Sequence, residues 1–215
     1  IPGAVFTALT CLVYTNIYRR SFSWRGIMSI AVSYVDSFGI PRCGCPDFNL
    51  GSNPKKWAMN DLTYCVVNRD SDLDPEVWDS LIKEAFDSWS KVSNLKFEQV
   101  VERQSANVII DIGSGQSHHF DGPLGTLAWA YLPPKVDFDG QLLMKFDTDE
   151  VWTTDQSETG TLLRNVAAHE IGHILGLSHS SIEKALMAPY YSVDVHCPQL
   201  DDDVKRIQEL YGSPL

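Results

Sequence analysis

Apolar residues at helical spacing predict three helices between residue 75 and residue 210. Residues 75–92 carry such a stripe, with Asp72 or Asp74 near its start as a cap. A second helix is expected over residues 158–175 and a third over residues 202–210. The third begins with two aspartates, which are favourable at the positive end of a helix dipole.

Shorter apolar runs between these helices predict the strands of a sheet. There are five such runs: residues 62–68, 95–100, 107–112, 127–131 and 141–146. The run at 107–112 is nearly all apolar, which predicts a central strand. The order of elements, strand, helix and further strands followed by two helices, predicts an α/β (α+β) sheet above a helical lower part with a cleft between them.

Composition narrows the class of protein. At 215 residues the chain can hold one sizeable domain and a short extra segment, and 44% of its residues are hydrophobic. The formal net charge of −11 argues against nucleic acid or an anionic membrane as a partner and suits Ca²⁺ binding through carboxylates. Residues 4–14 are apolar but too short to cross a bilayer, so no membrane span is expected. They fit either the remains of a signal segment or a helix.

Residues 169–179 have the pattern H-E-x-x-H-x-x-G-x-x-H. His169 and His173 are one helical turn apart and project from the same face, while Gly176 lets the helix stop and the chain turn. That turn would bring His179 round as a third ligand. Three imidazoles leave one tetrahedral position of Zn²⁺ open, as in catalytic sites. Glu170 would then act as the general base on a water molecule at the metal.

A methionine follows this motif in residues 185–191, A-L-M-A-P-Y-Y. The extended histidine motif with a Met-containing turn after it resembles the metzincin zinc peptidases. The resemblance implies that Met187 lies under the zinc site as an apolar floor. Taken alone, Met187 could equally be an ordinary core residue.

Residues 41–47, P-R-C-G-C-P-D, resemble the cysteine switch P-R-C-G-x-P-D of the matrix metalloproteinases, or matrixins. Thiolate is a strong zinc ligand, so the resemblance implies that Cys43 fills the fourth zinc position and keeps the enzyme latent. Arg42 is expected to hold this segment through an internal carboxylate, that of Asp47. Other stretches match the family in order and spacing: residues 61–64, 120–123, 146–150, 166–168 and 210–212.

The matrixin resemblance implies a twisted, mostly parallel five-stranded sheet with three helices, and a zinc cleft between an upper and a lower subdomain. Residues 1–45 are expected to be a short pro-segment and residues 46–215 the catalytic domain. No haemopexin-like domain is expected after residue 212, so general matrix or peptide cleavage is expected rather than cleavage of triple-helical collagen. The expected partners of this secreted, monomeric zymogen are extracellular protein or peptide substrates, an activating protease and protein inhibitors of metalloproteinases.

The resemblance also implies a structural Ca²⁺ held by carboxylates and carbonyl oxygens. The ligands carried over by position are Asp121, Gly122, Leu124, Thr126, Asp147 and Glu150. The alternative is an acidic turn solvated at the surface. The family's second, structural zinc is expected to be absent, because Trp129 and Lys145 stand where two of its histidines would be. His118 and His119 alone do not make a tetrahedral site.

Substrate is expected to bind along an edge strand at residues 127–129. An extended peptide would add to Leu127 and Ala128 through backbone hydrogen bonds. By resemblance, Pro189 and Tyr191 would wall a side-chain pocket beside the zinc. Asn165 lies four residues before His169, hence on the same helix face. It would point into or beneath that pocket and shorten or hydrate it, or else only bond backbone.

Five cysteines, an odd number, imply at least one free or metal-bound thiol in an extracellular protein. We expect a disulfide between Cys65 and Cys197. Cys45 stands where the family has an apolar residue, so it could compete with Cys43 for zinc or pair with Cys11.

The sequence therefore predicts a zinc-dependent endopeptidase that also binds Ca²⁺. The alternative is a catalytically silent zinc- and calcium-binding interaction module, in which Cys43 or Cys45 keeps the zinc capped. The presence of Glu170 and all three histidines favours the enzyme.

Overall fold

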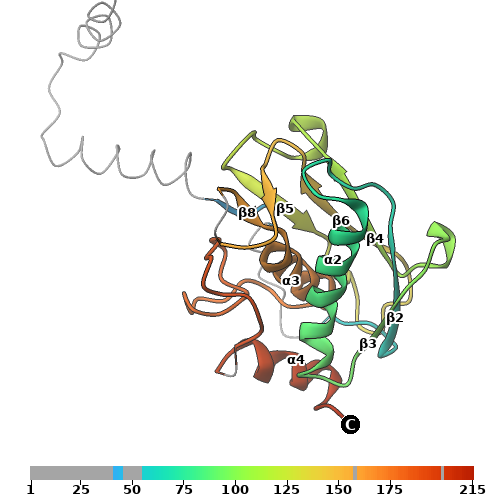
Figure 1. The fold of residues 1–215 in the computed structure, drawn as a ribbon. Helices are drawn as coiled ribbons and strands as arrows, with labels where there is room; N and C mark the ends of the chain where they lie inside the picture. Colours follow the sequence, from blue (N-terminus) through green and yellow to red (C-terminus); the bar gives the residue numbers. More distant parts are fainter. Residues whose placement is uncertain (1–40, 46–54, 157–158, 200) are drawn as a thin grey trace, which may run out of the picture. The chain divides into compact units, whose positions relative to one another are not determined.

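A six-stranded, mostly parallel sheet is the frame of the computed structural model (Figure 1). The structure describes residues 41–45, 55–156, 159–199 and 201–215. The sheet order is β1-β5-β6-β4-β2-β3, and β5 and β6 are antiparallel whereas the other pairs are parallel. The strands are Arg42–Cys43 (β1), Asp61–Val66 (β2), Lys96–Gln99 (β3), Val108–Gly113 (β4), Thr126–Ala130 (β5) and Leu142–Asp147 (β6).

The five predicted strands are all present, and the sequence analysis missed only the short β1 of this sheet. β4 lies between β6 and β2, which confirms its central position. Val108, Ile109 and Ile110 are all at most 1% exposed, because both faces of this strand are covered. A nearly continuous apolar run is what such a position requires.

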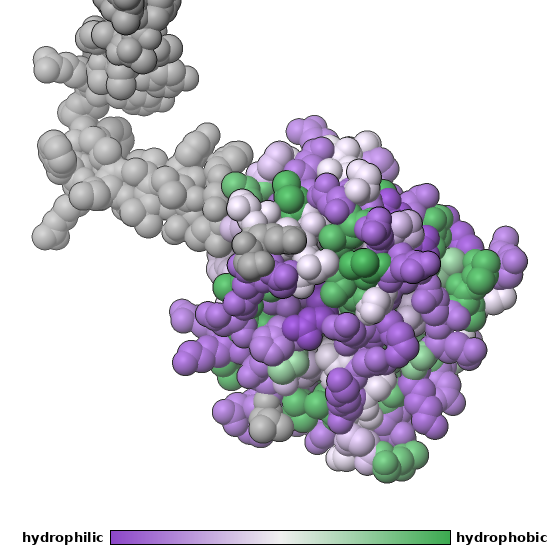
Figure 2. Space-filling view, viewed as in Figure 1, coloured by the Kyte–Doolittle hydropathy of each residue, from purple (hydrophilic) through white to green (hydrophobic). Residues whose placement is uncertain are grey.

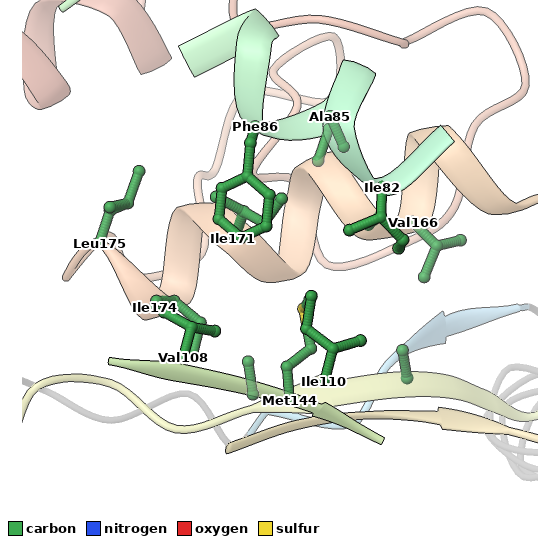
Figure 3. Packing of buried hydrophobic residues seen from close by; sticks show 14 of the residues in the cluster. Ile82, Ala85, Phe86, Val108, Ile110, Met144, Val166, Ile171, Ile174 and Leu175 are labelled. Carbon is green, nitrogen blue, oxygen red and sulfur yellow. The ribbon is translucent and has the colours of Figure 1, made fainter. Parts of the chain in front are cut away.

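The helices of the described residues are α2 (Pro75–Ser90), α3 (Leu163–Ile174) and α4 (Asp203–Tyr211), which confirms the predicted α/β class. Figure 3 shows how Ile171 and Ile174 of α3 pack between the sheet residues Val108 and Ile110 and Phe86 of α2. The indole nitrogen of Trp89 on α2 donates to the carbonyl of Ala168 on α3 at 2.8 Å. Apolar packing and this buried hydrogen bond therefore fix α3 against both neighbours.

The start of α3 differs from the sequence prediction. The helix begins at Leu163 and not at residue 158, because Thr161–Leu162 (β8) pairs with Trp152–Thr153 (β7) in a separate two-stranded sheet. Gly160 has a φ of +150°, and a Cβ there would collide with the carbonyl oxygen of Val151. This close approach of two backbones keeps the segment extended before the helix starts.

The remaining regular elements are two short 3₁₀ turns, η1 (Arg103–Ser105) and η2 (Gln116–His118). Asp74 is the N-cap residue of α2, although its side chain makes no capping hydrogen bond. Among the described residues, no helix combines the length and the apolar character that crossing a membrane requires. On the face viewed in Figure 2, hydrophobic side chains form small patches among hydrophilic ones.

Several expectations fall on residues outside the described ranges. These are the features before residue 41, Cys11 among them, and the role of Asp47. The division into a pro-segment (1–45) and a catalytic domain (46–215) stays a prediction.

Candidate metal centre and active site

Helix α3 holds the first two histidines of the motif in a buried position. His169 and His173 are one turn apart, and their Nε2 atoms lie 3.1 Å from each other. His169 is 8% exposed and His173 1% exposed. The helix therefore aims two imidazole nitrogens at a single point.

The chain turns at Gly176 and brings the third histidine to the same point. Gly176 has a φ of +98°, and a Cβ there would collide with the carbonyl oxygen of Lys55. Glycine is thus required both for the left-handed conformation and for the close approach. After the turn, Nε2 of His179 lies 3.2 Å from Nε2 of His173.

Backbone carbonyls fix the tautomers of the two helical histidines. Nδ1 of His169 lies 2.6 Å from the carbonyl oxygen of Leu186, and Nδ1 of His173 lies 2.7 Å from that of Leu177. Burial lowers the pKa of His169 to about 4 and that of His173 below its usual value, so both rings are neutral at pH 7. Because a carbonyl only accepts, each Nδ1 carries the ring proton and each Nε2 keeps its lone pair.

These lone pairs fit a tetrahedral zinc ion. Nitrogens bound to zinc at 2.0–2.1 Å are separated by about 3.3 Å in a tetrahedron, close to the distances found here. Unprotonated nitrogens so close together repel each other unless a cation lies between them. Sγ of Cys43 lies 3.4 Å from Nε2 of His173, within reach of a fourth position on a metal held there. The ligand atoms of Cys43 and the three histidines all lie within 4.8 Å of one another.

Glu170 lies beside this cluster and is fully buried. Burial raises the pKa of its carboxyl to about 7. Its Oε1 has no hydrogen-bond partner among the described residues, while Oε2 lies 3.6 Å from Sγ of Cys45. A carboxylate with a pKa near neutrality and one free oxygen is suited to exchanging a proton.

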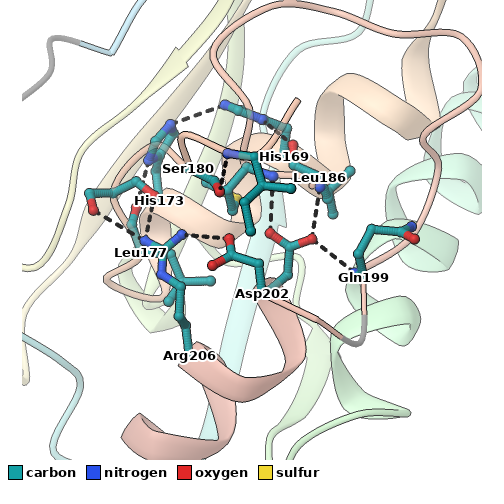
Figure 4. A network of polar contacts seen from close by, with 12 residues as sticks. His169, His173, Leu177, Ser180, Leu186, Gln199, Asp202 and Arg206 are labelled. Carbon is teal, nitrogen blue, oxygen red and sulfur yellow. Dashed lines mark hydrogen bonds and ion pairs between the residues drawn. The ribbon is translucent and has the colours of Figure 1, made fainter. Parts of the chain in front are cut away.

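Met187 forms a floor under the histidine helix. It is completely buried, and a Cβ on Gly172 of α3 would collide with its sulfur atom. The buried carboxylate of Asp203 accepts hydrogen bonds from the backbone N–H groups of Leu186, Met187 and Gln199 at 2.7–3.1 Å. Figure 4 shows Leu186 between His169 and the start of α4, so this network links the last helix to a metal ligand.

An ion pair in the same network supports the loop that carries His179. Arg206 of α4 contacts Asp202 at 3.2 Å and donates to the carbonyl of Ser178 at 2.6 Å (Figure 4). Both ends of the histidine motif are therefore tied to α4.

The short strand β1 lies in the cleft, between β5 and residues 189–191. Gly44 donates its N–H to the carbonyl of Ala128 at 2.8 Å, and Cys43 donates to Pro189 at 3.0 Å. β5, predicted to be an edge strand, is covered by β1 in this state of the chain. Arg42 contacts Asp121 at 2.8 Å, so a carboxylate of the loop before β5 helps to hold the segment.

A small cavity of about 30 Å³ opens beside His169. Four of the five predicted substrate-binding residues line it: Leu127, Asn165, Pro189 and Tyr191. Ala128 does not line the cavity but contacts β1 through its backbone. Nδ2 of Asn165 donates to the carbonyl of Val193 at 3.1 Å, whereas its buried Oδ1 has no partner among the described residues.

The predicted calcium ligands lie around the loop 121–126. Asp121 accepts a hydrogen bond from the N–H of Thr126 at 2.6 Å, and Glu150 accepts one from Leu124 at 2.7 Å. Burial raises the pKa of Asp147 to about 6 and also raises that of Glu150, and neighbouring carboxylates add to both shifts. Oδ2 of Asp147 is buried without a partner among the described residues. A cation would relieve this repulsion.

The carboxylates of that region do not converge as closely as the ligands at the histidines. Within the described ranges, the groups whose ligand atoms converge are the two that contain Cys43 and His173, and neither includes Asp121, Asp147 or Glu150. One oxygen of Asp121 is taken by Arg42. The calcium ligand set, with Gly122, therefore stays a prediction.

Trp129 and Lys145 are directly opposite each other on β5 and β6. The indole of Trp129 donates to the carbonyl of His118 at 2.7 Å, and its ring makes an edge contact with His119. Lys145 contacts Asp111 of β4 at 3.5 Å, and both side chains are less than a fifth exposed. At the positions where the family has two zinc-binding histidines, this chain therefore has an ion pair (Lys145 with Asp111) and an aromatic contact (Trp129 with His119).

The cysteines differ from the sequence prediction in two respects. The disulfide between Cys65 and Cys197 is not formed: both are free thiols, and Cys65 bonds the carbonyl of Val101 instead. Sequence reasoning also missed the place of Cys45 beside Glu170. The available signal was the short spacing, because only Gly44 separates Cys45 from the cysteine expected at the zinc.

Comparisons with known proteins agree with this geometry. The Peptidase_M10 family model, described as matrixin, matches residues 56–212. Stromelysin-1 of Mus musculus is 42% identical over 186 residues, which cover 81% of this chain and 37% of that protein. A hatching enzyme of Paracentrotus lividus is 41% identical over 221 residues, which cover 99% of this chain and 36% of that protein. This chain spans little more than a third of the length of these relatives. The family match and these identities show that the chain belongs to the matrixin family.

Proposed function

We propose that this chain is a zinc-dependent endopeptidase of extracellular proteins, kept latent by the segment around Cys43. The observation that carries the proposal is the convergence of three histidine Nε2 atoms beside the buried Glu170. Matrixins use a catalytic zinc ion and calcium, and the donor set found here suits zinc.

His169, His173 and His179 would hold the metal. Zinc in that position supplies Lewis acidity, which polarises the carbonyl of a peptide bond and makes water more acidic. Glu170 takes a proton from the attacking water through its free oxygen and delivers it to the amine nitrogen that leaves. A pKa of about 7 suits both halves of that transfer, because the group can hold or release a proton near neutral pH.

Latency follows from the position of β1. Cys43 takes the fourth ligand position, and the backbone of β1 uses the hydrogen-bonding groups of β5 that an extended substrate would need. Substrate therefore cannot bind productively until β1 leaves. An activating protease would achieve this by cutting the chain after the switch. Loss of the bond between Cys43 and zinc would favour the same release, because that bond anchors β1 at the metal.

The cavity beside the histidines would receive the side chain that follows the scissile bond. Its walls are mainly apolar, and Asn165 adds a carbonyl oxygen that has no hydrogen-bond partner among the described residues. That oxygen can accept a hydrogen bond from a polar side chain or from water in the pocket. We expect Asn165→Leu to favour peptides with leucine after the scissile bond, measured as kcat/KM against a serine-containing peptide.

Secretion, matrix proteins as substrates and control by protein inhibitors belong to the same proposal. The acidic chain, with a net charge of −11, and the expected calcium site suit a calcium-rich extracellular setting. The stromelysin and hatching-enzyme relatives support it, although they are much longer than this chain.

Cleavage of a quenched fluorescent peptide tests the proposal. The chain is assayed before and after an organomercurial that captures Cys43, with and without a zinc chelator. We expect activity to appear on treatment and to vanish with the chelator. Silence in both states, with zinc bound, would instead support the non-enzymatic binding module.

Two serine variants test whether latency depends on Cys43 in particular or on the loss of any thiol. Cys43→Ser removes the thiolate ligand and should be active without the organomercurial. Cys65→Ser changes a buried thiol on β2, away from the cleft, and should stay latent. Equal latency of both variants would contradict the role of Cys43.

A further inference from the structure

Two thiols of the latency segment face the catalytic groups together. Gly44 separates Cys43 from Cys45 just after β1 ends, and the N–H of Cys45 donates to Sγ of Cys43 at 3.2 Å, so the chain bends around the first thiol. Cys43 lies against His173, whereas Cys45 lies against Glu170. Sγ of Cys43, Sγ of Cys45 and the ligand atoms of Glu170 and His173 all lie within 4.8 Å of one another.

We infer that Cys43 and Cys45 form a redox-active dithiol, which an oxidising disulfide such as oxidised glutathione converts to an intramolecular Cys43–Cys45 disulfide. The consequence for activity rests on the proposed latency of the zinc site, but the modification itself does not. A disulfide sulfur is no longer a thiolate, so the oxidation would remove the fourth zinc ligand and the thiol beside Glu170 in one step.

The burial of the two thiols sets the order of attack. Cys43 is partly exposed and lines the open cavity, whereas Cys45 is only 7% exposed and lies behind it. The external disulfide therefore reacts first with Cys43. The sulfur of Cys45 accepts an N–H from Ala130 at 3.2 Å, a contact that keeps it close to the first thiol.

The chemistry is two successive thiol–disulfide exchanges. The sulfur of Cys43 attacks the glutathione disulfide, forms a mixed disulfide and releases one glutathione. The sulfur of Cys45 then attacks the Cys43 sulfur, which forms the internal disulfide and releases the second glutathione. Both cysteines are oxidised, the glutathione disulfide is reduced, and the two thiol hydrogens end on the two glutathione molecules.

The local backbone can support the ring that this creates. Disulfides bridge Cα atoms up to about 6.8 Å apart, which is near the most that two residues of chain can span. The N–H of Cys45 already reaches Sγ of Cys43 at 3.2 Å, so the two residues lie closer than in a straight strand. The intervening residue is glycine, the residue type whose backbone adapts most easily. A modest bend at Gly44 brings the sulfurs together, and it would also strain the hydrogen bond from Gly44 to Ala128.

Mass spectrometry of the full chain with oxidised glutathione tests the inference. We expect the wild-type chain to lose two hydrogen atoms, with neither Cys43 nor Cys45 open to alkylation. In Cys45→Ser, glutathione should stay bound to Cys43, and the fraction of chains with this adduct should be about tenfold or more that of the wild type. In the wild type, the nearby thiol of Cys45 displaces the glutathione faster than free thiols in solution can. Cys65→Ser is the matched control and should behave as the wild type.

Three results would overturn the inference. They are a glutathione adduct on wild-type Cys43 at the level of Cys45→Ser, a disulfide from Cys43 to Cys11 or Cys197, and no reaction at either thiol. Peptide cleavage is then measured on the same oxidised sample, before and after reduction by a phosphine. A chain that forms the internal disulfide, yet in its reduced form cleaves no peptide after the organomercurial, would contradict the proposed function and leave the dithiol chemistry standing, so the two failures are distinguishable.

Discussion

Replacing Asp203 by asparagine should weaken both the fold and the metal site. The buried carboxylate accepts three backbone hydrogen bonds, from Leu186 and Gln199 on one oxygen and from Met187 on the other. The amide has one acceptor oxygen, so Asp203→Asn keeps at most the two bonds on that oxygen and turns its NH₂ group toward the remaining N–H. The change leaves a buried donor without a partner, facing another donor.

The expected loss in the free energy of unfolding follows from these three hydrogen bonds. A hydrogen bond to a charged group contributes about 1.5–3 kcal/mol, and a neutral one about 0.5–1.5 kcal/mol. Losing one charged bond and weakening two others costs about 3–5 kcal/mol, and relief from burying a charge offsets part of this. We expect the free energy of unfolding to fall by about 2–4 kcal/mol.

The same change should reach the metal through Leu186. That residue gives its N–H to Asp203 and its carbonyl to Nδ1 of His169, so loosening one end loosens the other. Partners that orient a metal ligand typically contribute about 10–100-fold in affinity. We expect a zinc affinity lower by about that factor.

Urea unfolding and zinc competition against a chelator measure the two effects. Asp201→Asn is the matched control, because it makes the same chemical change at an exposed residue just before α4. If Asp203→Asn matched this control in both assays, the link from α4 through Leu186 to His169 would be wrong.

Three further predictions concern close packing and buried charge. Gly172→Ala should lower the free energy of unfolding by up to about 2 kcal/mol in urea, because overpacking against Met187 outweighs the gain in helix propensity. Gly44→Ala should raise the peptidase activity of the untreated chain, since the new methyl group collides with Thr126 and dislodges β1. Without calcium, stability should fall as the pH rises through about 6, because folding raises the pKa of Asp147 to about 6 and the folded state loses a bound proton there. Calcium should abolish that loss, and thermal unfolding at several pH values would show whether it does.

The fold was predictable where local pattern decides structure. The helix at residues 75–90 and the buried strand at residues 108–113 follow from apolar spacing alone. The start of α3 was not predictable in this way, because the pairing of Thr161–Leu162 with Trp152–Thr153 overrides the helical pattern. The two-residue strand β1 likewise exists only through its partners β5 and the segment at residue 190.

The candidate site also contains parts that local sequence predicts and parts that it does not. His169, Glu170, His173 and Gly176 lie within two helical turns, so their spacing encodes their geometry. The ion pair of Arg42 with Asp121 joins residues 79 positions apart, and no local pattern indicates it. The missing Cys65–Cys197 disulfide shows the same limit, because cysteine pairing depends on distances in the folded chain.

The most direct test of the central claim compares the wild-type chain with Glu170→Gln, both loaded with zinc and treated with the organomercurial. Peptide cleavage and bound zinc are measured on the same samples. We expect equal zinc in both and a kcat lower by about 10²–10⁴-fold in the variant, because the proton-accepting carboxylate is gone. Wild-type chain that holds zinc without cleaving any peptide, or a variant as active as the wild type, would contradict it.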